Sequence, residues 1–155
     1  MDHVTVPTGL RYPDLVSAFE RELPRWDPMV ALERHASWSD ITRDVERLAP
    51  PHGLLILHRV DHGAITSLAG TTKRCSLYLL GNPIAVEPIL GADIRASVSL
   101  PVRVTLYDDG GASGAHIAYE RPSATLGAAG EALDRQLADV VSAVTRRRSE
   151  STDMR

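Results

Sequence analysis

The stretch Arg74–Pro83, RCSLYLLGNP, is an apolar strand-like run that ends abruptly in a turn. Side chains of a strand alternate between two faces, so the odd and the even positions of this run point in opposite directions. Cys75 shares a face with Leu77, and we expect it to pack in the core rather than act as a nucleophile. Asn82 is a good helix N-cap and Pro83 a good first helical residue. The stretch therefore predicts a strand followed directly by a helix.

Apolar runs on either side of this stretch predict further strands. Leu54–Val60 is continuously apolar at its start, which is typical of a strand buried on both faces. Beyond the predicted helix, apolar residues occupy the even positions from Ile94 to Leu106. A single strand of that length is too long for a small domain, so we expect a bend or a break at Pro101.

The segment Asp109–Gly114 is rich in glycine and predicts the loop of a β-hairpin. Pairing the two ends of this loop fixes which side chains lie opposite one another. Apolar pairs then fall on one face and polar pairs on the other, which is the cross-strand chemistry that hairpins favour. The predicted pairs are Leu106 with Ile117, Val104 with Tyr119, Tyr107 with His116, Thr105 with Ala118 and Arg103 with Glu120.

Three segments have the periodicity of helices. Pro13–Leu23 has apolar residues at helical spacing, and a second helix is predicted to begin with Ser39 as its cap. The last and longest helix is predicted by an apolar stripe from Leu126 to Val144. We expect a single domain over residues 1–148 and a disordered polar tail over residues 149–155.

Composition narrows the classes of function. A chain of 155 residues with a net charge of −3 fits one globular domain and lacks the basic stripe of a nucleic-acid-binding protein. A single cysteine excludes an intrachain disulfide. The first residues lack the pattern of a signal peptide, and the longest aliphatic run, residues 54–57, is too short to span a membrane. We expect a cytoplasmic protein without nucleic-acid or membrane partners.

Five short motifs in fixed order resemble the bacterial and archaeal family named for domain of unknown function 302 (DUF302). The resemblance covers the segment from Asp61 to about Val141, roughly half of the chain. It implies an α+β fold, here with an antiparallel sheet of five to six strands and helices on one face, and a homodimer; it implies no activity. The longer stretch over residues 25–53 departs from the family pattern. The motifs are Asp61-His62, Gly81-Asn82-Pro83, Leu100-Pro101, Tyr107-Asp108-Asp109-Gly110 and Tyr119-Glu120-Arg121-Pro122.

Asp61 and His62 are the candidate catalytic residues. A carboxylate beside an imidazole can fix the tautomer of the ring and raise its basicity, as general acid–base catalysis requires. Neighbours on a strand point to opposite faces, so the pair acts together only if the turn at Gly63 reorients it. The alternative role for Asp61 is to cap the turn after its strand. We expect no metal site, because His58 and His62 would stand about 13 Å apart on a strand.

The candidate ligand-binding residues lie at a strand end and on one face of the hairpin. Asn82 caps a helix, where free backbone N–H groups favour an anion or a carbonyl oxygen. Its alternative role is plain capping. The polar hairpin face would gather Arg103, Tyr107, His116 and Glu120, as a ligand site, a dimer interface or a solvated surface.

Three functions fit these residues. The leading hypothesis is a homodimeric domain that binds a small molecule in a pocket near Asp61-His62 and Asn82, without a cofactor. The first alternative is a cofactor-independent isomerase, cyclase or hydrolase that uses Asp61 or His62 as acid–base. The second is a structural subunit that contacts its partner through Trp26, Met29 and Trp38, which would otherwise line a pocket or cover the core.

Overall fold

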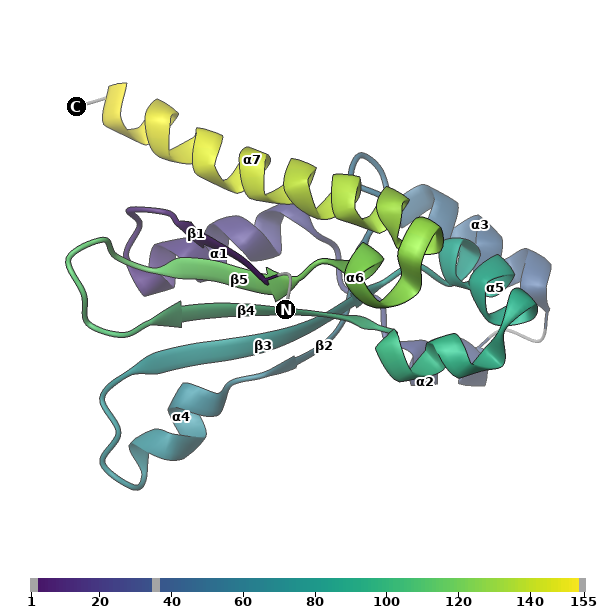
Figure 1. The fold of residues 1–155 in the computed structure, drawn as a ribbon, viewed down its shortest axis with the longest axis horizontal. Helices are drawn as coiled ribbons and strands as arrows, with labels where there is room; N and C mark the ends of the chain where they lie inside the picture. The colour runs from purple at the N-terminus through teal and green to yellow at the C-terminus, as the bar shows by residue number, and fades with distance from the viewer. Residues whose placement is uncertain (1–2, 35–36, 154–155) are drawn as a thin grey trace.

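The computed structural model describes residues 3–34 and 37–153, of which residues 147–153 are described by their backbone alone. Strands and helices both contribute to the fold and follow one another along the chain (Figure 1). The strands are β1 (His3–Pro7), β2 (Leu55–Val60), β3 (Arg74–Gly81), β4 (Val102–Asp108) and β5 (His116–Glu120). The helices are α1 (Tyr12–Glu22), α2 (Pro28–Arg34), α3 (Trp38–Leu48), α4 (His62–Ser67), α5 (Pro83–Ala92), α6 (Pro122–Leu126) and α7 (Glu131–Asp153), with 3-10 turns η1 (Ile94–Ser99) and η2 (Gly127–Gly130).

The strands form one antiparallel sheet in the order β1-β5-β4-β3-β2. Helices α1 and α7 lie on the same side of this sheet, and within the described chain no helix crosses the opposite side of β4 and β5 (Figure 1). The predicted α+β fold, with an antiparallel sheet, helices on one face and a long C-terminal helix, is confirmed. The sheet therefore has a core face and an open face.

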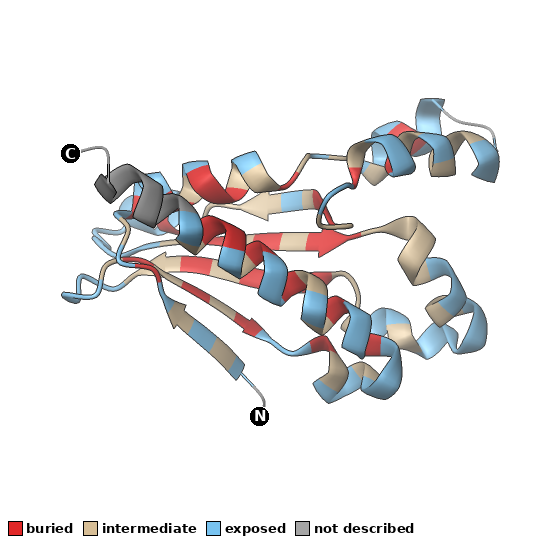
Figure 2. Ribbon diagram, turned by 90° about the horizontal axis from the view of Figure 1, so that it is seen from above, coloured by how far each residue is buried: buried red, intermediate tan, exposed pale blue. Residues whose placement is uncertain are grey.

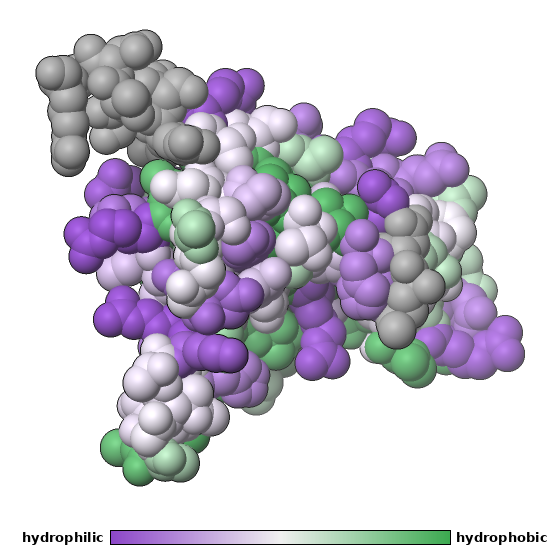
Figure 3. Space-filling model, turned by 60° about the vertical axis from the view of Figure 1, so that its left-hand side comes forward, coloured by the Kyte–Doolittle hydropathy of each residue, from purple (hydrophilic) through white to green (hydrophobic). Residues whose placement is uncertain are grey.

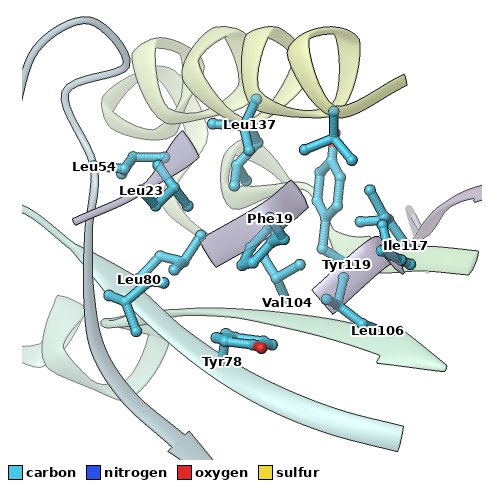
Figure 4. Packing of buried hydrophobic residues seen from close by; sticks show 14 of the residues in the cluster. Phe19, Leu23, Leu54, Tyr78, Leu80, Val104, Leu106, Ile117, Tyr119 and Leu137 are labelled. Carbon is cyan, nitrogen blue, oxygen red and sulfur yellow. The ribbon is translucent and has the colours of Figure 1, made fainter. Parts of the chain in front are cut away.

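The core lies between the sheet and helices α1 and α7. Phe19 of α1 packs against Tyr78 of β3 with ring centroids 4.8 Å apart, and Leu137 of α7 lies above them (Figure 4). Buried residues concentrate on the strands and on the side of α7 that faces them (Figure 2). Burial of this large apolar surface is the main favourable contribution to folding.

The alternation predicted for β3 is confirmed, but the core lies on the other face. Ser76, Tyr78 and Leu80 are fully buried, whereas Cys75 and Leu77 are half-buried on the open face. The prediction that Cys75 packs in the core is therefore wrong. Periodicity shows which residues share a face, but only the position of α1 and α7 decides which face is covered.

A polar network on the core face explains why a serine occupies a fully buried position. The Ser76 hydroxyl lies 2.7 Å from the Tyr12 hydroxyl of α1 and accepts hydrogen bonds from the Arg59 guanidinium at 2.9 and 3.2 Å. Arg59 also lies over the Tyr78 ring, 5.5 Å from its centroid, and 3.6 Å from a Glu20 carboxylate oxygen. The Tyr78 hydroxyl in turn donates to Glu20. The network joins α1 to β2 and β3.

Strand β2 lies at the edge of the sheet, which corrects the expectation that it is buried on both faces. Only its first residues, Leu55 and Ile56, are buried, and His58 is exposed. The chain around Pro24 and Trp26 covers this first half, since Ile56 N–H donates to the Pro24 carbonyl and Trp26 N–H donates to the Ile56 carbonyl. This contact protects part of an edge that would otherwise expose unpaired backbone groups.

The predicted break before β4 is sharper than a bend. Residues 94–99 form the 3-10 turn η1, and the strand begins only at Val102. Asp93 caps η1, because its carboxylate accepts a hydrogen bond from the Arg95 N–H at 3.0 Å. Hydrogen bonds from the Arg95 guanidinium and, to a smaller extent, from this N–H lower the pKa of the Asp93 carboxyl. The cap at Asp93 therefore stabilises a turn where the alternating pattern predicted a strand. As a result Val98 is 92% exposed.

The predicted hairpin register is confirmed for four of its five pairs, from Tyr107 opposite His116 to Val104 opposite Tyr119. The paired residues stop before Arg103 and Glu120. The apolar face of the hairpin is buried and the polar face lies on the open side of the sheet.

The helices differ from the predictions at their ends. The cap of α3 is Ser37 rather than Ser39, and its hydroxyl accepts from the Asp40 N–H. The stripe predicted as one C-terminal helix is divided into α6, η2 and α7, because Gly127 has a φ of 60°. Residues 149–153, which we expected in a disordered tail, continue α7 to Asp153.

We predict that Ser76→Ala destabilises the fold by about 1–3 kcal/mol, because Arg59 and Tyr12 lose a buried hydrogen-bond partner. Urea denaturation measures the change in the free energy of unfolding. Ser17→Ala, on the exposed side of α1, is the matched control and should stay within about 0.5 kcal/mol of wild type. Equal stability of the two variants would contradict a structural role for the network.

We predict that Gly130→Ala costs about 1–3 kcal/mol, since a Cβ at this position would lie 2.5 Å from the backbone carbon of Pro122. Gly91→Ala provides the matched control. A Cβ there meets nothing closer than Glu87 at 3.7 Å, so the substitution should stabilise helix α5 by about 0.5–1 kcal/mol. Thermal denaturation of both variants checks the opposite signs.

Alkaline pH should destabilise the protein through Tyr78. Burial raises the pKa of the Tyr78 phenol above its ordinary value of 10.0, and the negative charge of the Glu20 carboxylate raises it further. Above that pH the unfolded chain releases a proton that the folded chain retains, so the free energy of unfolding falls as pH rises. Urea denaturation between about pH 9 and 11 should show a flatter decline for Tyr78→Phe than for wild type. Parallel curves would refute the assignment.

Candidate functional site

Asp61 and His62 lie at the junction of β2 and α4. The Asp61 carboxylate caps α4 by accepting from the Ala64 N–H at 2.9 Å, and its other oxygen lies 3.6 Å from the Arg59 guanidinium. This capping role is the alternative that the sequence left open. His62 is the exposed first residue of α4 and makes no side-chain hydrogen bond to any other described residue. The structure does not join the two side chains by a hydrogen bond.

Asn82 lies between β3 and α5 and caps the helix as predicted. Its Oδ1 accepts from the Ile84 N–H at 2.9 Å, and its Nδ2 donates to the Gly53 carbonyl at 2.9 Å. The second bond ties the start of α5 to the loop before β2. Asn82 therefore fixes the position of α5 relative to the sheet.

The pocket expected to join Asp61-His62 with Asn82 is not formed. Strands β2 and β3 are antiparallel, with Leu55 opposite Gly81 and Val60 opposite Leu77. The residue after β2 and the residue after β3 consequently lie at opposite ends of the strand pair, about six residues or roughly 20 Å apart. Convergence of strand ends is a property of parallel strands, whereas β1 to β5 all pair antiparallel.

The polar residues of the hairpin lie on the open face in two separate groups. The Tyr107 and His116 rings stack with centroids 5.0 Å apart and an angle of 6° between their planes. Arg103 and Glu120 lie about 13 Å further along the strands. They line a shallow hollow of about 580 Å³ between η1 and α6, into which Tyr107 and His116 do not extend. Both charged side chains are exposed.

The most apolar hollow lies at the end of the sheet where Asn82 is found. It has a volume of about 360 Å³, within the range of small-molecule sites, and is enclosed by α2, α3, α5 and η1. We call it the tryptophan pocket, because Trp26 and Trp38 both line it. Its other lining residues are Pro28, Leu32, Ile41, Leu57, Gly81, Asn82, Pro83, Val86, Leu90, Ser97, Leu100 and Pro101.

Sequence reasoning found part of this pocket. It singled out Trp26, Met29 and Trp38 as possible lining residues, and the two tryptophans are in place, whereas Met29 is 66% exposed and lies outside. It missed the wall formed by Val86 and Leu90 of α5. The missed signal was the composition of α5, PIAVEPILGA, in which Glu87 is the one charged residue although none of the residues is buried.

A family model described as a domain of unknown function, DUF302, matches residues 30–151. The chain belongs to the DUF302 family. The match includes most of the stretch over residues 25–53 that we expected to depart from the family pattern. Three of the elements around the tryptophan pocket, α3, α5 and η1, therefore lie wholly within the matched region of this DUF302 protein.

The fold of this DUF302 protein resembles a solved structure. The crystal structure of an uncharacterized conserved DUF302 protein from Bacillus stearothermophilus aligns with a TM-score of 0.64. The alignment covers 93% of this chain and 98% of the other at 13% sequence identity. At this identity the similarity shows the fold alone. No curated protein matches the chain.

The opposite end of the DUF302 domain holds a more polar hollow of about 410 Å³, bordered by Arg11, Lys73 and Arg74 together with Asp108 and Asp109. Charges of both signs line it, so it has no clear preference for an ion. Among the described residues no group of three or more His, Cys, Asp or Glu side chains gathers to hold a metal ion. No helix in that part of the chain has both the length and the apolar character needed to cross a bilayer.

The α4 segment projects from the same end of the domain as a small knob with a hydrophobic tip, surrounded by hydrophilic surface (Figure 3). Ile65 and Leu68 are the exposed apolar residues of this segment, at 63% and 91%. It lies far from the tryptophan pocket along the sheet, and therefore supplies control positions for tests of that pocket.

Proposed function

We propose that this DUF302 protein binds a small, mainly apolar molecule in the tryptophan pocket. The observation that carries the proposal is the lining of the hollow, which combines two indole rings with aliphatic side chains and has no charged residue among the described residues that line it. Ligand pockets are typically concave and apolar, with a few polar groups that fix the orientation of the ligand. Such a lining favours ligands that leave water for an apolar environment.

The exposure of α5 supports this proposal. An apolar helix of a globular protein normally buries its apolar residues, yet Val86 and Leu90 remain only half-buried beside an open hollow. A ligand in the pocket would remove this surface from water, at about 25 cal/mol per Å² of apolar area. In the free protein this apolar surface stays exposed to water and contributes no such stabilisation.

Asn82 acts in this proposal as part of the wall. Its Oδ1 and its Nδ2 each make one hydrogen bond within the protein, so its role is to hold α5 against the loop at Gly53. Ser97 is the other side chain with a hydroxyl or amide group on the wall, and it is exposed. The polar end of a ligand would therefore lie near η1 rather than deep in the pocket.

Other expectations stay predictions. A catalytic role of Asp61 and His62, ligand contacts of Arg103, Tyr107, His116 and Glu120, and contact with a protein partner are not needed for ligand binding in the tryptophan pocket. The homodimer implied by the family is also a prediction, which sedimentation equilibrium would test. A cytoplasmic location also stays a prediction.

We predict that N-phenyl-1-naphthylamine, a neutral apolar fluorophore, binds the wild-type protein with a stoichiometry of one and quenches its tryptophan fluorescence. The chain contains two tryptophans, Trp26 and Trp38, and both line the pocket, so the quenching reports on this site. Leu90→Asp should weaken binding by about tenfold or more, because it replaces apolar wall with a carboxylate.

The matched control is Leu68→Asp, since Leu68 is 91% exposed at the α4 knob. This variant should bind the fluorophore as wild type does. Circular dichroism and the melting temperature must show that both variants are folded. Equal binding by wild type and Leu90→Asp, or no saturable binding by wild type, would refute the proposed function.

A further inference from the structure

We infer that the occupant of the tryptophan pocket is an unbranched aliphatic chain whose polar end is neutral or cationic. This inference rests on the proposed function and specifies the class of ligand. It depends on two observations that the proposed function does not use, which are a second hollow beside the pocket and the charges around both.

The tryptophan pocket continues into a second, more open hollow of about 430 Å³ along α5. Four residues line both hollows, namely Trp38, Pro83, Val86 and Leu90. Gly91 and Ile94 extend the second hollow toward η1, and Ile94 is 70% exposed. The two hollows are therefore parts of one elongated groove with a common wall.

The common wall is one row of side chains along α5. Pro83, Val86 and Leu90 are three and four residues apart, which places them in one row along a helix. Seven residues of helix span about 10 Å, and the ten residues of α5 about 15 Å. The indole of Trp38, half-exposed, faces this row from α3. A groove of this shape matches an extended chain better than a compact ring system, which would fill only the tryptophan pocket.

Charge selects the polar end of the ligand. Glu87 lines the open hollow, and no Lys or Arg is among the described residues that line either hollow. A carboxylate or phosphate at the end of the chain would meet a like charge without a cationic partner. An ammonium group would lie beside the Glu87 carboxylate, and a hydroxyl would be tolerated.

The test displaces N-phenyl-1-naphthylamine with primary amines of six, eight, ten, twelve, fourteen and sixteen carbons, each below its micelle-forming concentration. Affinity should rise about threefold to fourfold for each added methylene while the groove is being filled, as expected for a buried methylene. It should level off once the chain exceeds the roughly 15 Å length of α5. Decylamine should bind about twofold to fivefold more tightly than decanol, and decanoate more weakly than either, as expected for an exposed charge pair.

Two variants locate the chain in the groove. Val86→Phe narrows the row that both hollows share, so it should flatten the dependence of affinity on chain length. Val98→Phe is the matched control, because Val98 is 92% exposed and lines neither hollow. It should leave the dependence unchanged. Glu87→Gln should abolish the preference for decylamine over decanol while leaving decanol binding unaltered.

The outcomes separate this inference from the proposed function. If the fluorophore binds but amines of increasing length compete equally, or if decanoate competes best, the inference is overturned and the function stands. If the fluorophore does not bind at all, both fail. If the fluorophore does not bind and Leu90→Asp converts a dimer into a monomer in sedimentation equilibrium, the groove is an interface between two copies of the chain, which also overturns the inference.

Discussion

The hydroxyl of Ser76 is the constraint on which the arrangement of the domain depends. It has no access to solvent, so its hydrogen-bonding capacity must be met within the protein, and Tyr12 and Arg59 meet it from α1 and β2. These bonds hold α1 over one face of β3. Because α7 packs against α1, the same contact decides where the C-terminal helix lies. The buried hydroxyl thereby fixes the position of α1 on the face of the sheet where the apolar core residues Tyr78 and Leu80 also lie.

The one-sided sheet leaves two regions of the domain open to solvent. Its open face exposes the stacked Tyr107 and His116 rings and the charged residues Arg103 and Glu120. The end near Asn82 is covered by α2, α3 and α5, which enclose a hollow instead of filling it. The hollow is open to solvent and lined mainly by apolar side chains, as ligand pockets commonly are. It is the feature of the domain that most resembles a binding site.

The direction of the strands decides which candidate residues lie close together. In a parallel sheet, the ends of consecutive strands meet at one edge, where ligands commonly bind. Here β2 and β3 are antiparallel, so Asp61 caps one helix and Asn82 caps another at the opposite end. Each residue has the local role that its sequence context predicts. Their distance apart follows from the antiparallel pairing, so the two caps do not belong to one site.

The sequence by itself determined the local features of this protein. It identified the alternation of β3, the hairpin pairs around Tyr107 and His116, and the caps Asp61 and Asn82, because each depends on residues that are close along the chain. Tertiary structure alone decided that Ser76 rather than Cys75 faces the core, that residues 94–99 leave the sheet, and that both tryptophans border one groove with α5. Those outcomes depend on which helix covers which face, and periodicity carries no information about elements distant in sequence.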